Sequence, residues 1–536
     1  MRPPAEYVSQ MAEDRYDYVI VGAGSAGAVL AARLTEDAGT TVLLLEAGGE
    51  ADADEVSIPA AFPTLFKTRW DWNYQTTEQK QLHGRRAYWP RMKALGGCSS
   101  MNAMIYIRGN RADYDSWRDQ YGAAGWGFDD VLPYFVRSEA NTRLGGPLHG
   151  QSGPLHVSDR SYTHELSDLF VQSAVSAGLK PTDDFNGVEQ EGAGQYQVTC
   201  KGGRRWSTND AYLRPARSRP NLTVATGALA TRIELDGDRA TGVTFRQSGA
   251  EHTVTATREV LLCGGAVNSP QLLMLSGIGP GAHLAEVGVS AKVELGGVGS
   301  NLQDHPVVPM LWYTKGVTDL AQLNNVTNFL RWKVRGTGPL SSNVGEAGAF
   351  FASRDGLPAP DIQIHAAPSA FYDNGMQEPT SRMFTAGPTL VSVQSRGSVR
   401  LRSADPSWHP AIDAAYLEDQ ADLDALLAGA RRTWEICTQG ALSAYLDRPW
   451  NLPDDPSDED LVEHIRTWAQ TLYHPVATCA MGSGDDAVVD ASLKVRGVDG
   501  LRVVDASVMP AVTRGNTNAP TIMIAEKTAD EIRKSR

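Results

Sequence analysis

The first fifty residues alternate between short apolar runs and a stretch rich in glycine and alanine. Residues 16–21 (YDYVIV) are rich in β-forming residues, which predicts a buried strand. A glycine-rich turn over residues 22–27 (GAGSAG) leads into residues 28–37, whose alanine-rich composition predicts a helix. Residues 41–45 (TVLLL) predict a second buried strand. This order of strand, turn, helix and strand predicts a βαβ unit.

The glycines of this turn have the spacing of a dinucleotide-binding motif. Gly22 permits the tight turn, Gly24 lets the backbone approach a pyrophosphate, and Gly27 lets the helix pack closely on the strand. The phosphates would then lie at the helix N-terminus, where free N–H groups and the helix dipole favour anions. Glu46 follows Gly27 by nineteen residues and is placed to accept the ribose hydroxyls of the adenosine half. The motif alone leaves FAD and NAD both open.

Two elements are predicted near the C-terminus. Residues 501–505 (LRVVD) form an apolar run that predicts a further buried strand. Residues 517–520 (TNAP) predict the start of a helix, because proline is favoured in the first turn. Ile522, Ala525, Ala529 and Ile532 would give that helix one apolar face.

Composition and charge restrict the class of protein. The chain has 536 residues, which exceeds what one hydrophobic core usually fills, so two packed domains are expected. Its net charge of −14 argues against a nucleic-acid function, which needs a basic face. No apolar run approaches the ~20 residues of a membrane span, and the first fifteen residues lack a signal-peptide core. The five cysteines lie far apart without a CxxC pair, which favours reduced thiols and a cytoplasmic location. No histidine or acid spacing suggests a metal site.

Six further segments carry a resemblance to a known family. They are residues 90–109 (PRMKALGGCSSMNAMIYIRG), 265–279 (GAVNSPQLLMLSGIG), 297–305 (GVGSNLQDH), 473–479 (YHPVATC), 502–507 (RVVDAS) and 515–527 (GNTNAPTIMIAEK). In this order they resemble the glucose-methanol-choline (GMC) flavoprotein oxidoreductases, from about residue 15 to residue 534. The resemblance implies FAD as the dinucleotide and an alcohol as the usual substrate.

The resemblance also implies a domain organisation. We expect an α/β protein (α+β overall) with a Rossmann-like FAD-binding domain and a second, substrate-binding domain built on a mostly antiparallel sheet. The FAD-binding domain would comprise residues 15–160, 200–305 and 490–536, and the substrate-binding domain residues 161–199 and 306–489. The site is expected between the two domains.

Two positions depart from the pattern of the family. Met92 stands where the first signature usually has a small residue, which we interpret as a surface variation. Met101 occupies the position of the histidine that links the flavin covalently in some members. Because methionine cannot form that bond, we expect FAD to be held non-covalently.

The resemblance identifies two candidate catalytic residues. Oxidation of an alcohol removes a hydride from carbon and a proton from oxygen, and a neutral imidazole suits the role of proton acceptor. His474 stands where the family keeps its catalytic histidine, and Asn518 is assigned to the second active-site position. An amide there would hold the substrate oxygen by donating a hydrogen bond, although Asn518 also fits a helix cap. Eight other histidines lie in polar or charged stretches and are expected to be solvated: His83, His149, His156, His164, His252, His283, His409 and His464.

The cofactor contacts follow from the resemblance and the glycine motif. The expected set is Gly22, Gly24, Ser25, Ala26, Gly27, Glu46, Ala47, Gly97, Asn102, Ala103, Met104, Ala230, Tyr473, Asp505, Ala506, Pro520 and Thr521. Within it, residues 102–104 are expected against the isoalloxazine ring, and Asp505 and Ala506 near the ribityl chain and phosphates. His365, on an expected strand of the second sheet, and Trp72 are candidates for substrate contact, with core packing as the alternative for both.

The expected reaction is oxidation of a primary alcohol to an aldehyde, with hydride transfer to flavin N5 and His474 as the base. The pattern is closest to the aryl-alcohol and hydroxymethylfurfural oxidases and to choline-dehydrogenase-like bacterial enzymes, which favours benzylic, furanic or other small alcohols. Choline is less favoured, because no acidic and aromatic cage for a quaternary ammonium is evident. The alternatives are an FAD-dependent lyase or photodecarboxylase of the same family, a choline-type dehydrogenase, or an NAD-dependent dehydrogenase. The electron acceptor stays open between O2 and another acceptor.

Overall fold

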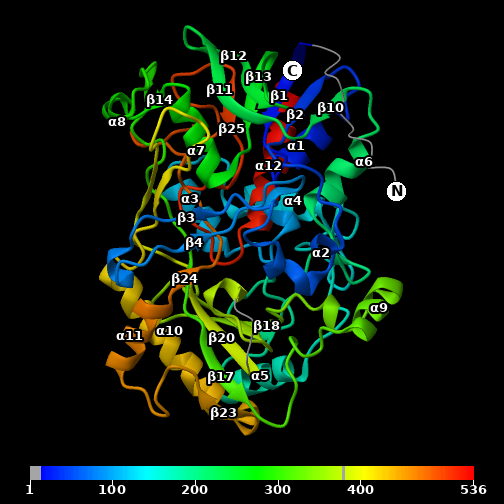
Figure 1. Cartoon of the computed structure of the whole chain (residues 1–536), viewed down its shortest axis with the longest axis vertical. Helices are drawn as coiled ribbons and strands as arrows, with labels where there is room; N and C mark the ends of the chain where they lie inside the picture. Colours follow the sequence, from blue (N-terminus) through cyan, green and yellow to red (C-terminus); the bar gives the residue numbers. More distant parts are fainter. Residues whose placement is uncertain (1–13, 377–380, 536) are drawn as a thin grey trace.

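The computed structural model describes residues 14–376 and 381–535 and contains two large β-sheets at opposite ends of the molecule (Figure 1). Residues 1–13, which belong to the stretch expected to lack a signal peptide, lie outside the described residues. Helices and strands occur together in both halves, which confirms the predicted fold class. No helix within the described residues is long and apolar enough to cross a membrane.

The first sheet has seven strands in the order β10-β2-β1-β13-β12-β11, with β25 paired to β13. Their bounds are β1 Arg15–Val21, β2 Val42–Leu45, β10 Leu222–Ala225, β11 Leu229–Asp236, β12 Arg239–Gln247, β13 Ala250–Leu262 and β25 Leu501–Val503. The strands β1, β2, β10, β13 and β25 are parallel to one another. Residues 18–21 of β1 and all of β2 are apolar, as is usual for parallel strands that are covered on both faces. The predicted βαβ unit and the predicted C-terminal strand are both present.

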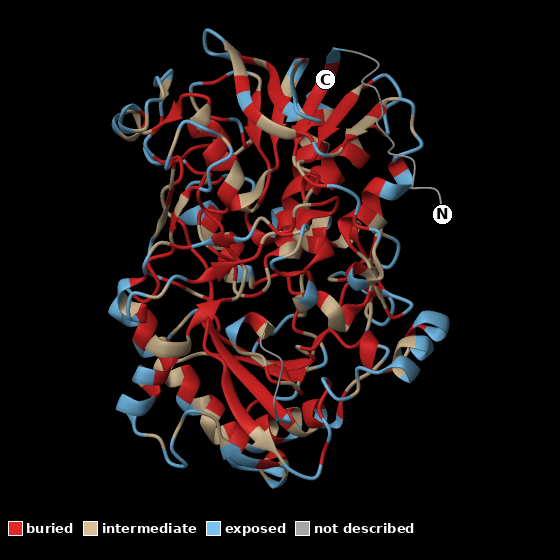
Figure 2. Cartoon of the chain, in the orientation of Figure 1, coloured by how far each residue is buried: buried red, intermediate tan, exposed pale blue. Residues whose placement is uncertain are grey.

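The helix α12 (Asn518–Lys534) runs through the interior of the molecule and ends beside α1 (Gly27–Leu34) (Figures 1 and 2). It begins at the predicted residues, but it is buried almost all round from residue 519 to 529 instead of on one face. The cause is that α1 and α4 (Phe128–Ser138) also pack on it. The buried Glu526 is accommodated there because Arg33 and the hydroxyl of Tyr212 donate to its carboxylate at 2.7 and 2.8 Å.

The second sheet has eight strands and is mostly antiparallel, in the order β23-β17-β20-β19-β18-β7 with β16 and β24 at one side. Their bounds are β7 Gly192–Gln195, β16 Pro306–Val307, β17 Met310–Thr314, β18 Ala347–Phe351, β19 Ile362–Ala367, β20 Met383–Leu390, β23 Leu446–Pro449 and β24 Gln470–Thr471. The helices α5 (Glu165–Ser176) and α10 (Gln420–Thr438) cover it. His365 lies on β19, as predicted.

The remaining elements lie outside the two large sheets. The helices are α2 Asp54–Ser57, α3 Arg111–Asp119, α6 Arg214–Ala216, α7 Gly265–Leu275, α8 Gly281–Glu286, α9 Val326–Arg335 and α11 Asp458–Trp468. The strand pairs are β3 Tyr74–Gln75 with β4 Tyr88–Trp89, β5 Glu139–Asn141 with β6 Leu155–Val157, β8 Cys200–Lys201 with β9 Arg204–Arg205, β14 Ile278–Gly279 with β15 Val293–Glu294, and β21 Ser398–Arg400 with β22 Ala411–Asp413.

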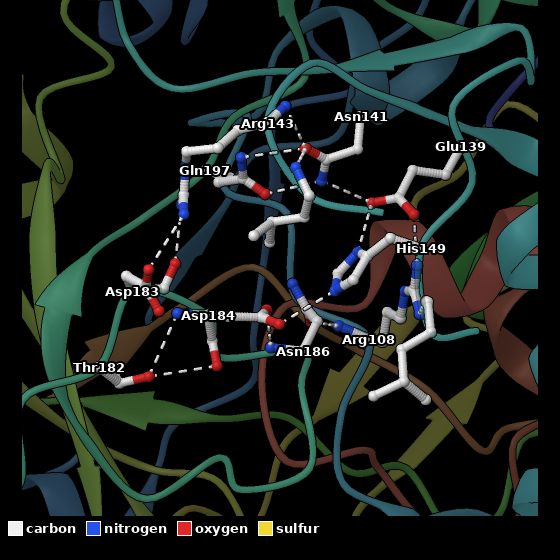
Figure 3. A network of polar contacts seen from close by, with 12 residues as sticks. Arg108, Glu139, Asn141, Arg143, His149, Thr182, Asp183, Asp184, Asn186 and Gln197 are labelled. Atoms are coloured by element: carbon white, nitrogen blue, oxygen red, sulfur yellow. Dashed lines mark hydrogen bonds and ion pairs between the residues drawn. The ribbon is translucent and has the colours of Figure 1, made fainter. Parts of the chain in front are cut away.

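A buried network of charged side chains joins three loops next to the first signature segment (Figure 3). Arg108 donates to Glu139 at 2.6 Å, and His149 lies between Glu139 (Nδ1 to Oε1, 3.2 Å) and Asp184 (Nε2 to Oδ2, 3.0 Å). The backbone N–H of Arg108 also donates to Asn186 at 2.8 Å. The network therefore fixes the chain that leads away from residues 102–104.

The expectation that eight histidines are solvated is wrong for three of them. His149, His164 and His464 are buried, each at most 6% exposed. Their polar sequence neighbours gave the wrong indication, because the burial comes from distant segments. His149 is enclosed by the carboxylates of Glu139 and Asp184, which lie on other loops.

Candidate active site

A cavity of about 540 Å³ lies between the two sheets and takes part of its wall from each. On the first sheet it reaches Val21, Leu45 and Leu262, which are the carboxyl-terminal ends of β1, β2 and β13. The carboxyl ends of parallel strands are where open α/β sheets bind ligands. On the second sheet the wall includes His365 on β19 and Thr385 on β20.

The glycine motif has the geometry that a dinucleotide needs. Gly22 has a φ of +100°, and a Cβ there would lie 2.5 Å from the carbonyl oxygen of Cys263. A Cβ on Gly27 would lie 1.9 Å from the carbonyl oxygen of Gly22, so this glycine allows α1 to pack against the turn. Gly24 differs from these two glycines. An added Cβ would have its nearest neighbour 3.8 Å away, and the residue lines the cavity. The backbone is therefore open to a ligand at Gly24.

Glu46 lies at the same end of the cavity and is fixed by the backbone. Its Oε2 accepts from the N–H of Ala23 at 2.9 Å and its Oε1 from the N–H of Gly48 at 2.8 Å. Burial raises the pKa of this carboxyl group, and the two backbone donors oppose that shift. Each oxygen keeps a lone pair for a hydroxyl donor, so the residue fits the ribose of a dinucleotide.

The first signature segment crosses the middle of the cavity. A Cβ on Gly97 would lie 2.6 Å from the Cα of Gly24, so the two glycines bring this segment against the dinucleotide turn. Asn102, Ala103 and Met104 line the cavity beyond it, and Asn102 Oδ1 accepts from the N–H of Met104 at 3.1 Å. Met104 has a φ of +59°, an uncommon conformation for a residue other than glycine. Such residues are often found at sites where the backbone contacts a ligand.

His474 closes the other end of the cavity, on a turn that several side chains hold in place. Tyr473, directly before it, has a φ of +70°, and its carbonyl oxygen accepts from Arg91 at 2.6 Å. Asp304 accepts from the backbone N–H of His474 at 2.8 Å and from the hydroxyl of Thr471 at 2.6 Å. These contacts fix the direction in which the imidazole points.

A second histidine orients the ring of His474. The Nδ1 atoms of His305 and His474 are 3.0 Å apart, with the two rings nearly perpendicular. On the opposite side of the ring, the amide Nδ2 of Asn516 lies 3.3 Å from His474 Nε2. An amide nitrogen only donates, so Nε2 carries the lone pair and Nδ1 the proton, which is donated to His305. The lone pair of His474 Nε2 therefore lies at the cavity, beside the Asn516 amide.

The residue next to His474 is Asn516 and not Asn518, which the sequence had suggested as its partner. Asn518 starts α12, and its Oδ1 accepts from the hydroxyl of Ser25 at 2.8 Å, at the dinucleotide turn. Both asparagines line the cavity, but Asn516 contacts His474 and Asn518 contacts Ser25. Asn516 precedes the helix, whereas Asn518 is its first residue.

Three histidines at this end influence one another electrostatically. Burial, followed by the charges of His305, His365 and Arg91, holds the pKa of His474 well below its usual value. Burial lowers the pKa of His305 to about 3, with His365 as a further cause, and burial alone lowers that of His365 to about 3. All three imidazoles are therefore neutral at neutral pH, which is the protonation state required of a base.

The cavity wall contains almost every residue that the sequence analysis selected. Gly22, Gly24, Ser25, Ala26, Glu46, Ala47, Trp72, Gly97, Asn102, Ala103, Met104, Ala230, His365, Tyr473, His474, Asp505, Ala506, Asn518 and Thr521 all line it. Gly27 and Pro520 do not, since Gly27 packs on the turn and Pro520 is buried in α12. Among the described residues, no group of three or more His, Cys, Asp or Glu side chains is placed to hold a metal ion.

The two candidate substrate residues differ in their surroundings. His365 Nδ1 lies 3.2 Å from the hydroxyl of Thr389, and its Nε2 has no hydrogen-bond partner among the described residues. Trp72 stacks on Tyr74 with ring centroids 5.8 Å apart, and the ammonium of Lys93 lies 4.6 Å from its ring centroid. His365 therefore lines the cavity and has a buried Nε2 atom without a partner among the described residues, whereas Trp72 is already packed on one face.

Sequence reasoning missed His305, Asp304 and Asn516. All three lie within segments that carry the resemblance, so the motifs could have indicated that they belong to the site. The spacing in the sequence did not show which atoms would meet, because residues 304 and 305 lie 170 and 169 positions before His474.

Comparisons with known proteins agree with this geometry. Two GMC oxidoreductase family models match residues 16–307 and 393–525. An oxygen-dependent choline dehydrogenase of Burkholderia pseudomallei is 45% identical over 538 residues, covering 98% of this chain and 95% of that protein. The crystal structure of pyridoxine 4-oxidase from Mesorbium loti is 32% identical with a TM-score of 0.89, covering 97% of this chain and 99% of that one. A fungal aryl-alcohol oxidase is 25% identical with a TM-score of 0.86, covering 98% and 99%.

The matched family models cover most of the chain, and the relatives align along nearly their whole length. The glycine turn, the open backbone at Gly24 and the fixed carboxylate of Glu46 fit the dinucleotide that this family binds. The chain therefore belongs to the GMC oxidoreductases, the family of FAD-dependent enzymes that oxidise CH–OH groups.

Proposed function

We propose that this enzyme oxidises a primary alcohol with an aromatic or other small apolar substituent to the aldehyde, with His474 as the base. The observation that carries the proposal is the pairing of the His474 Nε2 lone pair with the Asn516 amide at the cavity wall. His474 accepts the hydroxyl proton at Nε2, and His305 accepts the hydrogen bond from Nδ1 of the resulting imidazolium. The Asn516 amide donates to the substrate oxygen and holds it in place. Bound FAD supplies the acceptor for the hydride, at flavin N5.

The wall beside His474 favours an apolar substrate. Phe62, Phe66, Val307, Val344, Ala367 and Phe371 line the same cavity. An aromatic ring or another small apolar group would be buried favourably against them. His365, which lines the same cavity, is a candidate for contact with the substrate.

Choline is the second candidate, because relatives 45–46% identical are named as choline dehydrogenases. A quaternary ammonium is usually recognised by an aromatic cage and a negative charge. The carboxylates of the cavity wall are Glu46, Asp71 and Asp505. Asp71 already accepts from Tyr88 and from the N–H groups of Lys67, Asn73 and Arg91, and Asp505 from Gly265, Ser269 and Ser507. These donors are neutral and leave the carboxylates charged, so choline stays the second candidate, and the panel of alcohols below separates it from a neutral alcohol.

The proposal is tested by anaerobic bleaching of the flavin absorbance with a panel of alcohols. Benzylic and furanic alcohols should bleach the purified yellow protein faster than choline at equal concentration. Faster bleaching by choline would establish the choline-type dehydrogenase instead. If no alcohol bleached the flavin, the lyase or photodecarboxylase reaction would be assigned instead. These two are separated by measuring turnover in the dark and under blue light, because only the photodecarboxylase needs light. Rapid return of the colour in air would identify O2 as the electron acceptor.

We further propose that FAD is held non-covalently. Met101 is buried in the cavity wall at the position of the linking histidine, and a thioether forms no such bond. Acid precipitation of the yellow protein should release all of the flavin into the supernatant. Yellow colour that remained with the precipitated protein would contradict this.

The five cysteines are free thiols, which supports the expected cytoplasmic location.

The two asparagines should separate functionally when each is replaced. Asn516→Ala should lower the rate of anaerobic flavin bleaching by about 10²-fold, the effect of removing one donor to a reacting oxygen. Asn518→Ala should instead weaken FAD binding by about fivefold, the equivalent of one hydrogen bond of ~1 kcal/mol, because its amide lies at the dinucleotide turn. Stopped-flow bleaching and FAD titration of the apoprotein measure the two effects. A larger loss of bleaching rate in Asn518→Ala than in Asn516→Ala would restore Asn518 as the catalytic amide.

A further inference from the structure

Arg205, on the short strand β9, has a buried guanidinium that contacts the backbone of two different segments. The residue is only 4% exposed. Its Nε donates to the carbonyl oxygen of Val56 at 2.8 Å. Its Nη1 donates to the carbonyl oxygens of Ser99 (3.2 Å) and Asn102 (2.6 Å) and to Oδ1 of the Asn102 side chain (2.9 Å). Its Nη2 is buried and has no hydrogen-bond partner among the described residues.

These contacts join two segments that line the cavity. Asn102 is itself a wall residue and belongs to the first signature segment. Val56 lies in α2, directly before the segment that contributes Phe62 and Phe66 to the wall. The guanidinium is therefore one side chain away from the cavity, and it holds the two segments at a fixed separation.

The positive charge of Arg205 has no carboxylate partner within the described part of the chain. The acid that acts on it electrostatically is Asp210, which forms its own ion pair with Arg214 at 2.8 Å. Burial lowers the pKa of Arg205 to about 10, so the side chain is still charged at neutral pH. A buried charge that is satisfied only by carbonyl oxygens is costly unless another group compensates for it.

We propose that Arg205 is a positioning residue of the flavin site, and that its charge favours reduction of the bound FAD. Uptake of a hydride from the alcohol adds one negative charge to FAD, while the hydroxyl proton leaves to a base. A fixed cation in a low-dielectric surrounding stabilises that added charge. The same side chain, by holding Asn102 and Val56, keeps the wall in the shape that binds the flavin ring. This inference rests on FAD binding and not on which alcohol is the substrate.

The test compares the midpoint potential of the bound FAD and the affinity for FAD in three variants of the full-length protein. Arg205→Met should shift the FAD reduction equilibrium at least tenfold toward the oxidised form, which is about 30 mV for a two-electron couple. Arg205→Lys keeps the charge but has fewer hydrogen-bond donors. Its midpoint potential should therefore differ from that of the wild type by less than about 30 mV, whereas its affinity for FAD should fall. Arg204→Met is the matched control, because Arg204 lies over the Trp332 ring, 4.2 Å from its centroid, and donates to the carbonyl oxygen of Lys333 instead of to Asn102 or Val56. Its potential should equal that of the wild type.

An unchanged potential in Arg205→Met would overturn the electrostatic role, and an equal shift in Arg205→Lys would show that position and not charge is responsible. Where Arg205→Met loses FAD during purification, its affinities for oxidised and reduced FAD are titrated separately, since their ratio gives the same potential shift. A wild-type protein that binds no FAD would contradict the cofactor assignment itself, which keeps that failure distinct from a failure of this proposal.

Discussion

Replacing His474 with alanine should lower the rate of anaerobic flavin bleaching by about 10²–10⁴-fold, the usual range for loss of a general base. The lone pair of Nε2 is the proton acceptor at the cavity wall, and Asn516 would have no imidazole beside it in the variant. FAD should remain bound, because the hydrogen bonds that hold Glu46 and the close packing of the dinucleotide turn do not involve His474. Stopped-flow absorbance at saturating alcohol measures the rate, and the visible spectrum reports the retained flavin.

The pH profile separates a base from a residue that only shapes the pocket. The pKa of His474 is held below its usual value by burial and by neighbouring charges, so the acid limb of the wild-type profile should lie below pH 6.5. That limb should vanish in His474→Ala. His83→Ala is the control, because His83 is exposed and pairs only with Glu463 at 3.2 Å on the surface. Bleaching of His474→Ala at the wild-type rate would exclude His474 as the base.

Replacing His305 should give an intermediate loss. His305 does not reach the substrate, but it accepts from Nδ1 of His474 and thereby selects the tautomer with a free Nε2. Its replacement by phenylalanine, which fills a similar volume, would remove that selection without opening the core. The effect should therefore be smaller than that of His474→Ala.

The periodicity and glycine spacing of the sequence were enough to predict the dinucleotide half of the fold. Residues 16–21 and 41–45 are continuous apolar runs because parallel strands are covered on both faces, and such runs are recognisable without knowledge of the partners. The requirement for glycine at positions 22 and 27 is local, since it comes from the turn and the adjacent helix. The predictions of these two strands and of the turn between them needed only neighbouring residues, and they are confirmed.

Predictions that depended on distant residues were less secure. Asn516 and Asn518 are two positions apart in one motif, and only the packing of the turn against His474 and of α12 against Ser25 distinguishes them. Glu346 shows the same dependence on distant residues: it lies between Gly345 and Ala347, yet it is fully buried. The hydroxyls of Ser167 and Ser342 donate to its carboxylate at 2.7 and 2.6 Å. Tertiary partners of this kind leave no periodic signal in the sequence.

Replacing His149 with glutamine should destabilise the protein most at mildly acidic pH. The carboxylates of Asp184 and Glu139 raise the pKa of His149 from 6.5 to about 9 against the effect of burial. A rise from 6.5 to 9 corresponds to about 3 kcal/mol of stability at ~1.36 kcal/mol per unit, as an order of magnitude. Because the folded pKa is raised, this contribution is fully present below pH 6.5 and is lost as the pH rises through 9. Urea unfolding at pH 6 and pH 9.5 measures the difference between wild type and variant.

The matched control for this experiment is His83→Gln. His83 also pairs with a carboxylate, but both side chains are about half exposed or more, so the pair should contribute at most about 0.5 kcal/mol. His149 is enclosed at 3% side-chain exposure, where solvent screens the ion pairs far less. If His149→Gln lowered the free energy of unfolding by the same amount at pH 6 and at pH 9.5, His149 would act by packing and not by charge. In that case the network in Figure 3 would stabilise the segment after residue 104 independently of pH.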